Sequence, residues 1–322
     1  MSLTRTTFKP GGKRRALNGR KPRLPPGSNN GVVNHNRKSL LLPEEPWKER
    51  RRVIHSLLNG SALKQYGAWQ EEESAQMMAE YVIKPDMWYK HYYRYANLVV
   101  YRITLGERLF NIGTSLIDWF PEWEKLTQWN YEVEAGTAPP SFIRDKDSMY
   151  VAMQLIEAGT DTTREALNVL VMATLEYIEP FKKARAKIGE VCGAGYNARW
   201  PCLEDMESLQ YICAMAKEVL RWRPIFALTP DHTLSQDIEF EGYYFPAGVS
   251  FAINEVAHFE GRHWICVSYQ LTQRSLFINI ARLVQYFNYE AAGTYDPHEL
   301  DLEFIEELFP VKPRLRSEDY KN

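Results

Sequence analysis

The sequence feature that most constrains the fold is a long stretch of helical spacing over residues 148–179. Apolar side chains recur there every three or four residues, which places them on one face of a helix. These positions are Ala152, Leu155, Ile156, Leu167, Leu170, Val171 and Thr174. Residues 209–222 and 271–287 have similar spacing, and the first of these helices is expected to end before Pro224, since a proline forbids continuation.

A further helix is predicted to begin near Pro46, with four side chains along one stripe: Trp47, Arg51, Ile54 and Leu58. The segment 238–253 differs from these helices. Its aromatic and β-branched runs are separated by Gly242 and by residues 246–248, which is typical of short strands joined by turns. The predicted fold is therefore mainly α, with a small β-sheet late in the chain.

Composition indicates one globular unit or at most two, because 45% of the 322 residues are hydrophobic and 25% are charged. The net charge of −2 gives no reason to expect nucleic acid or a membrane surface as a partner. Charge is uneven, however, since ten Lys or Arg residues and no acid precede Glu44. Residues 1–45 are predicted to be a disordered basic arm, followed by a main domain over 46–310 and a C-terminal tail over 311–322.

The basic arm leaves two other interpretations open. Arg5–Lys38 could tether the chain to nucleic acid, but Phe8 is the one aromatic residue among these charges, and stacking residues are expected in such a tether. A targeting peptide is disfavoured by the proline and glycine content. No apolar run approaches the roughly 18 residues of a spanning helix, and the four cysteines lack metal-site spacing, so free thiols are expected.

Residues 158–163 read Ala-Gly-Thr-Asp-Thr-Thr within the long helix. Gly159 leaves a notch, and threonine hydroxyls can bond the carbonyl four residues earlier and bend a helix. The predicted result is a local widening lined by an acid and alcohols, suited to a small polar molecule and a proton relay. A poor helical segment tolerated by packing is an equally good interpretation of these residues alone.

Two more motifs follow. Glu218 and Arg221 lie three residues apart on a helix and can pair. Their apolar neighbours indicate partial burial, although a solvated pair is the better interpretation when the motif is taken alone. Cys266 stands just before the last helix, where backbone N–H groups favour a thiolate, and Arg262 or His263 could hold an anionic group. A lone cysteine is more often a small buried apolar residue.

The three motifs in this order resemble cytochrome P-450: an Ala-Gly-Thr-Asp-Thr-Thr helix, a Glu-x-x-Arg helix and a late cysteine before an apolar helix. Trp47 and Arg51 look like the pair that touches a haem propionate in this family. Residues 275–283 look like the last helix of fungal members. The resemblance covers residues 46–310 and implies a cytochrome P-450-like helical fold with a small β-sheet, here incomplete.

The resemblance implies a haem-thiolate monooxygenase that inserts one oxygen atom of O2 into a small apolar organic substrate. Cys266 would ligate the haem iron, Asp161 and Thr162 would deliver protons, and Glu218 and Arg221 would form a structural pair. Further residues would contact the cofactor or its oxygen: Trp47, Arg51, Ala158, Gly159, His232, Phe259, Arg262 and His263. Electrons would come from an NADPH-dependent cytochrome reductase, and family members occupy the cytoplasmic face of the endoplasmic reticulum membrane.

The chain departs from the family pattern at several places. Nothing before Pro46 corresponds to the family's anchor and first sheet, and the segment that normally follows His258 is missing, together with an arginine that completes the Glu-x-x-Arg network. In the cysteine loop, Gly261 and Arg262 come one residue early and Ser268 replaces a glycine. A non-catalytic remnant or misassembled gene product without a productive haem site is therefore the alternative, and whether the chain is an enzyme stays open.

Overall fold

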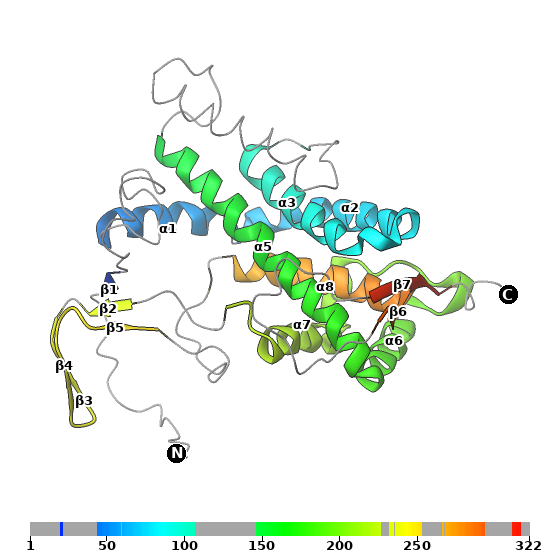
Figure 1. Cartoon of the computed structure of the whole chain (residues 1–322). Coiled ribbons are helices and arrows are strands. Elements are labelled where there is room, and N and C mark those ends of the chain that lie inside the picture. Colours follow the sequence, from blue (N-terminus) through cyan, green and yellow to red (C-terminus); the bar gives the residue numbers. More distant parts are fainter. Residues whose placement is uncertain are drawn as a thin grey trace.

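The computed structural model describes residues 20–21, 44–58, 60–106, 108, 146–226, 232–234, 236–252, 266, 268–293 and 311–316, and Figure 1 shows their arrangement. The helices are α1 (Glu44–Leu58), α2 (Ser61–Ile83), α3 (Trp88–Leu105), α5 (Lys146–Glu176), α6 (Ile178–Cys192), α7 (Gln210–Trp222) and α8 (Tyr269–Tyr286). Short 3-10 helices lie at η2 (Pro85–Met87), η4 (Gly195–Asn197) and η5 (Leu203–Met206). The prediction of a mainly α fold is confirmed.

The helices predicted from apolar spacing form close to their expected bounds. α5 buries Ala152, Ile156, Leu167, Leu170 and Val171 of its predicted stripe. α7 ends at Trp222, and the next residue is extended (φ −135°, ψ 90°), as expected for the residue before a proline. The local sequence therefore determines where these helices run and which face turns inward.

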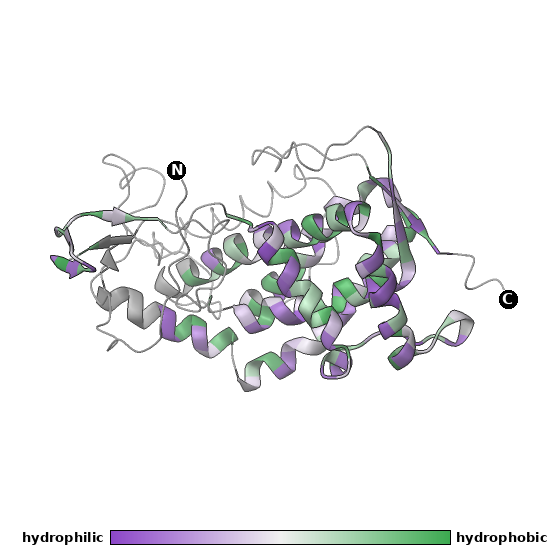
Figure 2. Ribbon diagram, turned by 90° about the horizontal axis from the view of Figure 1, so that it is seen from below, coloured by the Kyte–Doolittle hydropathy of each residue, from purple (hydrophilic) through white to green (hydrophobic). Residues whose placement is uncertain are grey.

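Packing joins the helices into one body. α5 lies along α3, α3 along α2, and α8 contacts α2, α5, α6 and α7. Figure 2 shows green apolar stripes on the helices, with the β3–β4 hairpin at one end of the molecule. The side chains with the least exposure in this core include Leu167, Leu170, Ile212 and Phe277. A smaller core ties α1 to α2, α5 and α8 through Ile54, Leu58, Leu63, Tyr66, Val151 and Leu271.

The strands form three small antiparallel sheets. β1 (Arg20–Lys21), β2 (His232–Leu234) and β5 (Ser250–Phe251) pair in the order β1-β2-β5, while β3 (Ile238–Phe240) and β4 (Tyr243–Phe245) form a hairpin. The late strands predicted over 238–253 are thus present. The remainder of the expected basic arm before residue 44 lies outside the described residues.

The third sheet lies late in the chain. β7 (Val311–Leu315) pairs with β6 (Phe287–Ala291), so residues 311–315 take part in a sheet, and the predicted domain bounds stay a prediction. Val311 and Pro313 are buried, whereas Lys312 and Arg314 are exposed. This alternation of period two is the pattern of a half-buried strand, but five residues rich in charge give only a weak signal of it in the sequence.

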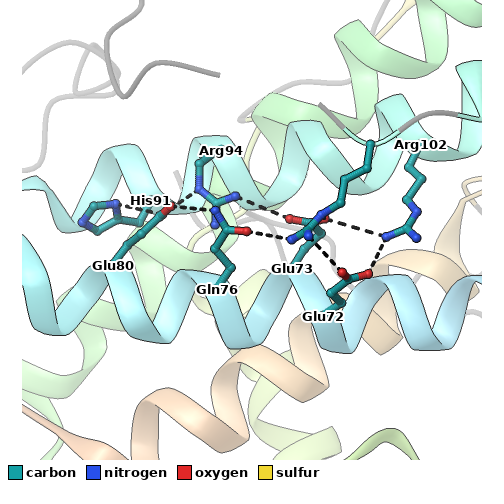
Figure 3. Close-up of polar contacts among 8 residues, drawn as sticks. Glu72, Glu73, Gln76, Glu80, His91, Arg94 and Arg102 are labelled. Atoms are coloured by element: carbon teal, nitrogen blue, oxygen red, sulfur yellow. Dashed lines mark hydrogen bonds and ion pairs between the residues drawn. The ribbon is translucent and has the colours of Figure 1, made fainter. Parts of the chain in front are cut away.

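A polar network between α2 and α3 was not predicted. Figure 3 shows Glu72, Glu73, Gln76 and Glu80 of α2 facing His91, Arg94 and Arg102 of α3. Arg94 Nε donates to Glu80 Oε2 at 2.6 Å, and Arg94 Nη1 lies 3.4 Å from Glu73 Oε2. Arg108 Nε donates to Glu73 Oε1 at 2.6 Å. The side chain of Glu73 is fully buried and that of Arg94 is 4% exposed, so these charges stabilise each other away from water.

In the described part of the chain, none of the helices combines the length and the apolar character that crossing a membrane requires.

Candidate functional site

One face of α5 at residues 158–163 packs against α3. Thr160 Oγ1 donates to the carbonyl of Ile156 at 2.6 Å and accepts a hydrogen bond from Asn97 Nδ2 at 3.1 Å. A Cβ placed on Gly159 would lie 2.7 Å from Val100 Cγ2. The predicted notch therefore exists, but the side chain of Val100 fills it, so Gly159 produces close helix packing and not a widening. Its expected place beside a bound oxygen stays a prediction.

This contact predicts the effect of a larger side chain. Gly159→Val should lower the free energy of unfolding by about 1–3 kcal/mol, because two branched side chains cannot share this space. Urea denaturation followed by circular dichroism measures the change. Ala158→Val on the exposed side of the same helix is the control and should cost at most about 0.5 kcal/mol. Equal losses for both variants would contradict the packing role of Gly159.

The other face of the motif is accessible. Ala158 and Asp161 are exposed and Thr162 is half-buried. Thr162 Oγ1 donates to the carbonyl of Ala158 at 2.8 Å, as the sequence predicted for a threonine four residues on. The Asp161 side chain is 60% exposed and lies 3.5 Å from Arg164 Nη2. The predicted acid and alcohol are thus both accessible to solvent on α5.

Glu218 and Arg221 form the predicted pair on α7. Arg221 donates from Nε to Glu218 Oε2 at 2.7 Å and from Nη2 to Oε1 at 2.5 Å, and this bonding lowers the pKa of Glu218. The two side chains are 59% and 53% exposed, so the pair is solvated, as the better interpretation of this motif alone had it, and the partial burial that its apolar neighbours indicated is wrong. The buried face of α7 carries Ile212, Met215, Ala216 and Val219, which point away from the charged pair.

Cys266 lies at the start of α8, as the sequence predicted. Its side chain is exposed, and its carbonyl accepts a hydrogen bond from the backbone N–H of Tyr269, the first residue of the helix, at 3.1 Å. Its Sγ lies 3.0 Å from Ser268 Oγ. α8 contacts α5, and Figure 1 shows α5 crossing it. The structure therefore brings the helix that follows Cys266 against the helix that bears Asp161 and Thr162.

The other three cysteines are poorer candidates for a thiolate. All four are free. Burial and the nearby Asp205 carboxylate raise the pKa of Cys192 to about 11, and burial raises the pKa values of Cys202 and Cys213. A protonated thiol is a weak metal ligand, so these three cysteines are poor candidates.

Several residues expected at the cofactor cannot be placed. Phe259, Arg262 and His263 lie outside the described residues, and so do the side chains of Trp47 and His232. Arg51 is half-buried on α1.

Comparison with known proteins agrees with the resemblance to cytochrome P-450 that the sequence motifs indicated. A family model described as cytochrome P450 matches residues 126–258, a stretch that includes α5, α6 and α7 and ends before Cys266. The cytochrome P450 monooxygenase verL of Clonostachys rogersoniana is 28% identical in an alignment 300 residues long that covers 73% of this chain and 55% of that protein. The cytochrome P450 monooxygenase atE of Aspergillus terreus is 26% identical and covers 65% of this chain and 50% of that protein. The chain thus spans about half the length of these curated relatives.

Solved structures agree on the fold. A zebra fish cytochrome P450 determined with progesterone aligns over 88% of this chain and 86% of its own, with a TM-score of 0.66 and 17% identity. A second zebra fish structure, determined with abiraterone, gives a TM-score of 0.65 at 18% identity. The shared helical fold, the matching family model and the fungal monooxygenase relatives all lead to the same assignment. This chain is similar to cytochromes P450 in its fold, in the family model that it matches and in its fungal relatives.

Proposed function

We propose that the chain forms the haem-thiolate centre of a monooxygenase, with Cys266 as the iron ligand and a small apolar organic molecule as the substrate. The observation that carries the proposal is the exposed Cys266 thiol at the start of α8, a helix in contact with α5. Similarity to cytochromes P450 implies haem iron held by a cysteine thiolate as the cofactor. The relatives named as monooxygenases support the reaction class.

The described residues fit this cofactor. Cys266 is exposed and stands two residues before the N-cap of α8, an 18-residue helix. Ala158 presents a single methyl group at an exposed position of α5, so it leaves room beside a planar ring. When bound, haem supplies the activation of O2, for which amino-acid side chains have no equivalent.

Proton movement falls to two residues of α5 in this proposal. Asp161 is exposed enough to exchange protons with water, and the hydroxyl of Thr162 is the neighbouring group that can pass a proton on. The bond from Thr162 to the carbonyl of Ala158 fixes the orientation of that hydroxyl. Ala158 would leave space beside the haem, whereas the notch at Gly159 is filled by Val100.

The remaining roles extend the proposal to residues and partners that follow from the similarity to cytochromes P450. Trp47, Arg51, His232, Arg262 and His263 would hold the propionates, with Phe259 in the cysteine loop and Glu218 and Arg221 as a structural pair. Electrons would come from an NADPH-dependent reductase, and O2 is the second substrate. The catalytic domain would cover residues 46–310, and the cytoplasmic face of the endoplasmic reticulum membrane is its proposed location.

Reconstitution tests the proposal. The full chain, supplied with haemin and reduced under carbon monoxide, should show the red-shifted Soret band of a thiolate-bound haem. Cys266→Ala should lose this band, because no other cysteine stands at a helix start with an exposed thiol. Cys213→Ala on α7 is the matched control and should keep it.

A wild-type chain without the band overturns the proposed function and favours the alternative, a non-catalytic remnant of the family. A band that persists in Cys266→Ala overturns the choice of ligand alone.

A further inference from the structure

We infer that Ser268 is a positioning residue whose hydroxyl donates a hydrogen bond to the thiolate of Cys266 and thereby reduces the charge that this sulfur donates to a metal. The inference rests on the proposed function, since it concerns the same ligand. Ser268 Oγ lies 3.0 Å from Cys266 Sγ. No other hydrogen bond of the Cys266 sulfur is found among the residues that the structure describes.

The position of Ser268 makes this contact unusual. Ser268 is the N-cap residue of α8, and a serine there ordinarily accepts a hydrogen bond from a backbone N–H in the first turn. In this structure its side chain makes no capping bond. Its backbone is also outside the extended conformation typical of an N-cap, with φ −87° and ψ 9°. The hydroxyl of Ser268 therefore contacts the sulfur of Cys266, and the first turn of α8 lacks a hydrogen bond from this side chain.

Two backbone hydrogen bonds hold this arrangement. The N–H of Tyr269 donates to the carbonyl of Cys266 at 3.1 Å, and the N–H of Thr272 donates to the carbonyl of Ser268 at 2.9 Å. The turn that carries the sulfur and the first turn of the helix that carries the hydroxyl are thus both fixed. The contact does not depend on a long flexible side chain.

The chemistry of the sulfur decides which atom donates. In the neutral thiol, either Cys266 or Ser268 could supply the hydrogen. A thiolate has no hydrogen to give, so Ser268 becomes the donor whenever the sulfur is ionised or bound to a metal. Hydrogen bonds to a ligand sulfur are a known means of tuning the reduction potential of the metal, and withdrawal of negative charge favours the reduced state.

Three variants test the inference in the full chain loaded with haem. Ser268→Ala removes the hydroxyl and should shift the reduction potential to a more negative value and the carbon monoxide Soret band further to the red. Ser268→Thr keeps the hydroxyl and should stay near the wild type. Thr272→Ala removes a hydroxyl one turn along α8 and is the matched control. Spectroelectrochemistry measures the potential.

A second measurement uses the haem-free protein, so the inference can be tested apart from the proposed function. In alkaline solution, where exposed thiols are ionised in both proteins, a hydrogen bond donated to the sulfur lowers its nucleophilicity. Alkylation of Cys266 by iodoacetamide should therefore be about threefold faster in Ser268→Ala. Mass spectrometry of the peptide that contains Cys266 follows the rate. A wild-type chain that lacks the thiolate-haem band overturns the proposed function. An unchanged reduction potential together with an unchanged alkylation rate of Cys266 in Ser268→Ala overturns the inference on Ser268 alone.

Discussion

Arg94→Met should lower the free energy of unfolding by about 3 kcal/mol, the lower end of the cost of removing one partner from a buried ion pair. Arg94 stands between Glu80 and Glu73, with its side chain 4% exposed. Its loss leaves two carboxylates in a poorly hydrated space. The cost is at the lower end because Glu73 keeps Arg108 at 2.6 Å and Glu80 keeps His91 at 3.4 Å.

Urea denaturation followed by circular dichroism measures this loss. The matched control is Arg314→Met, which removes an ion pair at 2.5 Å whose side chains are 62% and 53% exposed. Exposed pairs contribute at most about 1 kcal/mol, so the control should change little. Similar losses of unfolding free energy in both variants would show that Arg94 does not stabilise a buried charge network.

Phe277→Ala should cost about 3–5 kcal/mol, because it removes a large apolar side chain and leaves a cavity that the surrounding helices fill only in part. Phe277 is fully buried on α8, the helix that contacts α2, α5, α6 and α7. The loss therefore weakens several helix contacts at once. Because α8 also follows Cys266, the variant is expected to bind haem less well under the proposed function.

Phe240→Ala is the control for this substitution. Phe240 lies on the β3–β4 hairpin and is 50% exposed, so its removal should change the unfolding free energy by at most about 0.5 kcal/mol. Thermal and urea denaturation compare the two variants. A Phe277→Ala protein as stable as the control would contradict the placement of α8 at the centre of the core.

The candidate site was predictable where the signal is local. Residues 158–163, the Glu218–Arg221 pair and Cys266 are visible as motifs, and their helices form as expected. The hydroxyl bonds of Thr160 and Thr162 to carbonyls four residues earlier also follow from local geometry. The burial of each side chain did not follow from the sequence, because the apolar neighbours of the charged pair on α7 indicated partial burial and both charged side chains are exposed.

The sequence by itself determined which segments become helices and where they end, since helical spacing, a proline after α7 and threonine back-bonding act over a few residues. Tertiary structure alone decided which side of α5 meets Val100 and which side exposes Asp161. It also decided that Glu73 and Arg94, on different helices, would share a buried space. The physical reason is that a polar side chain becomes buried only where the side chains of another helix cover it and pair with it. The apolar spacing of one helix gives no information about the helix that packs against it.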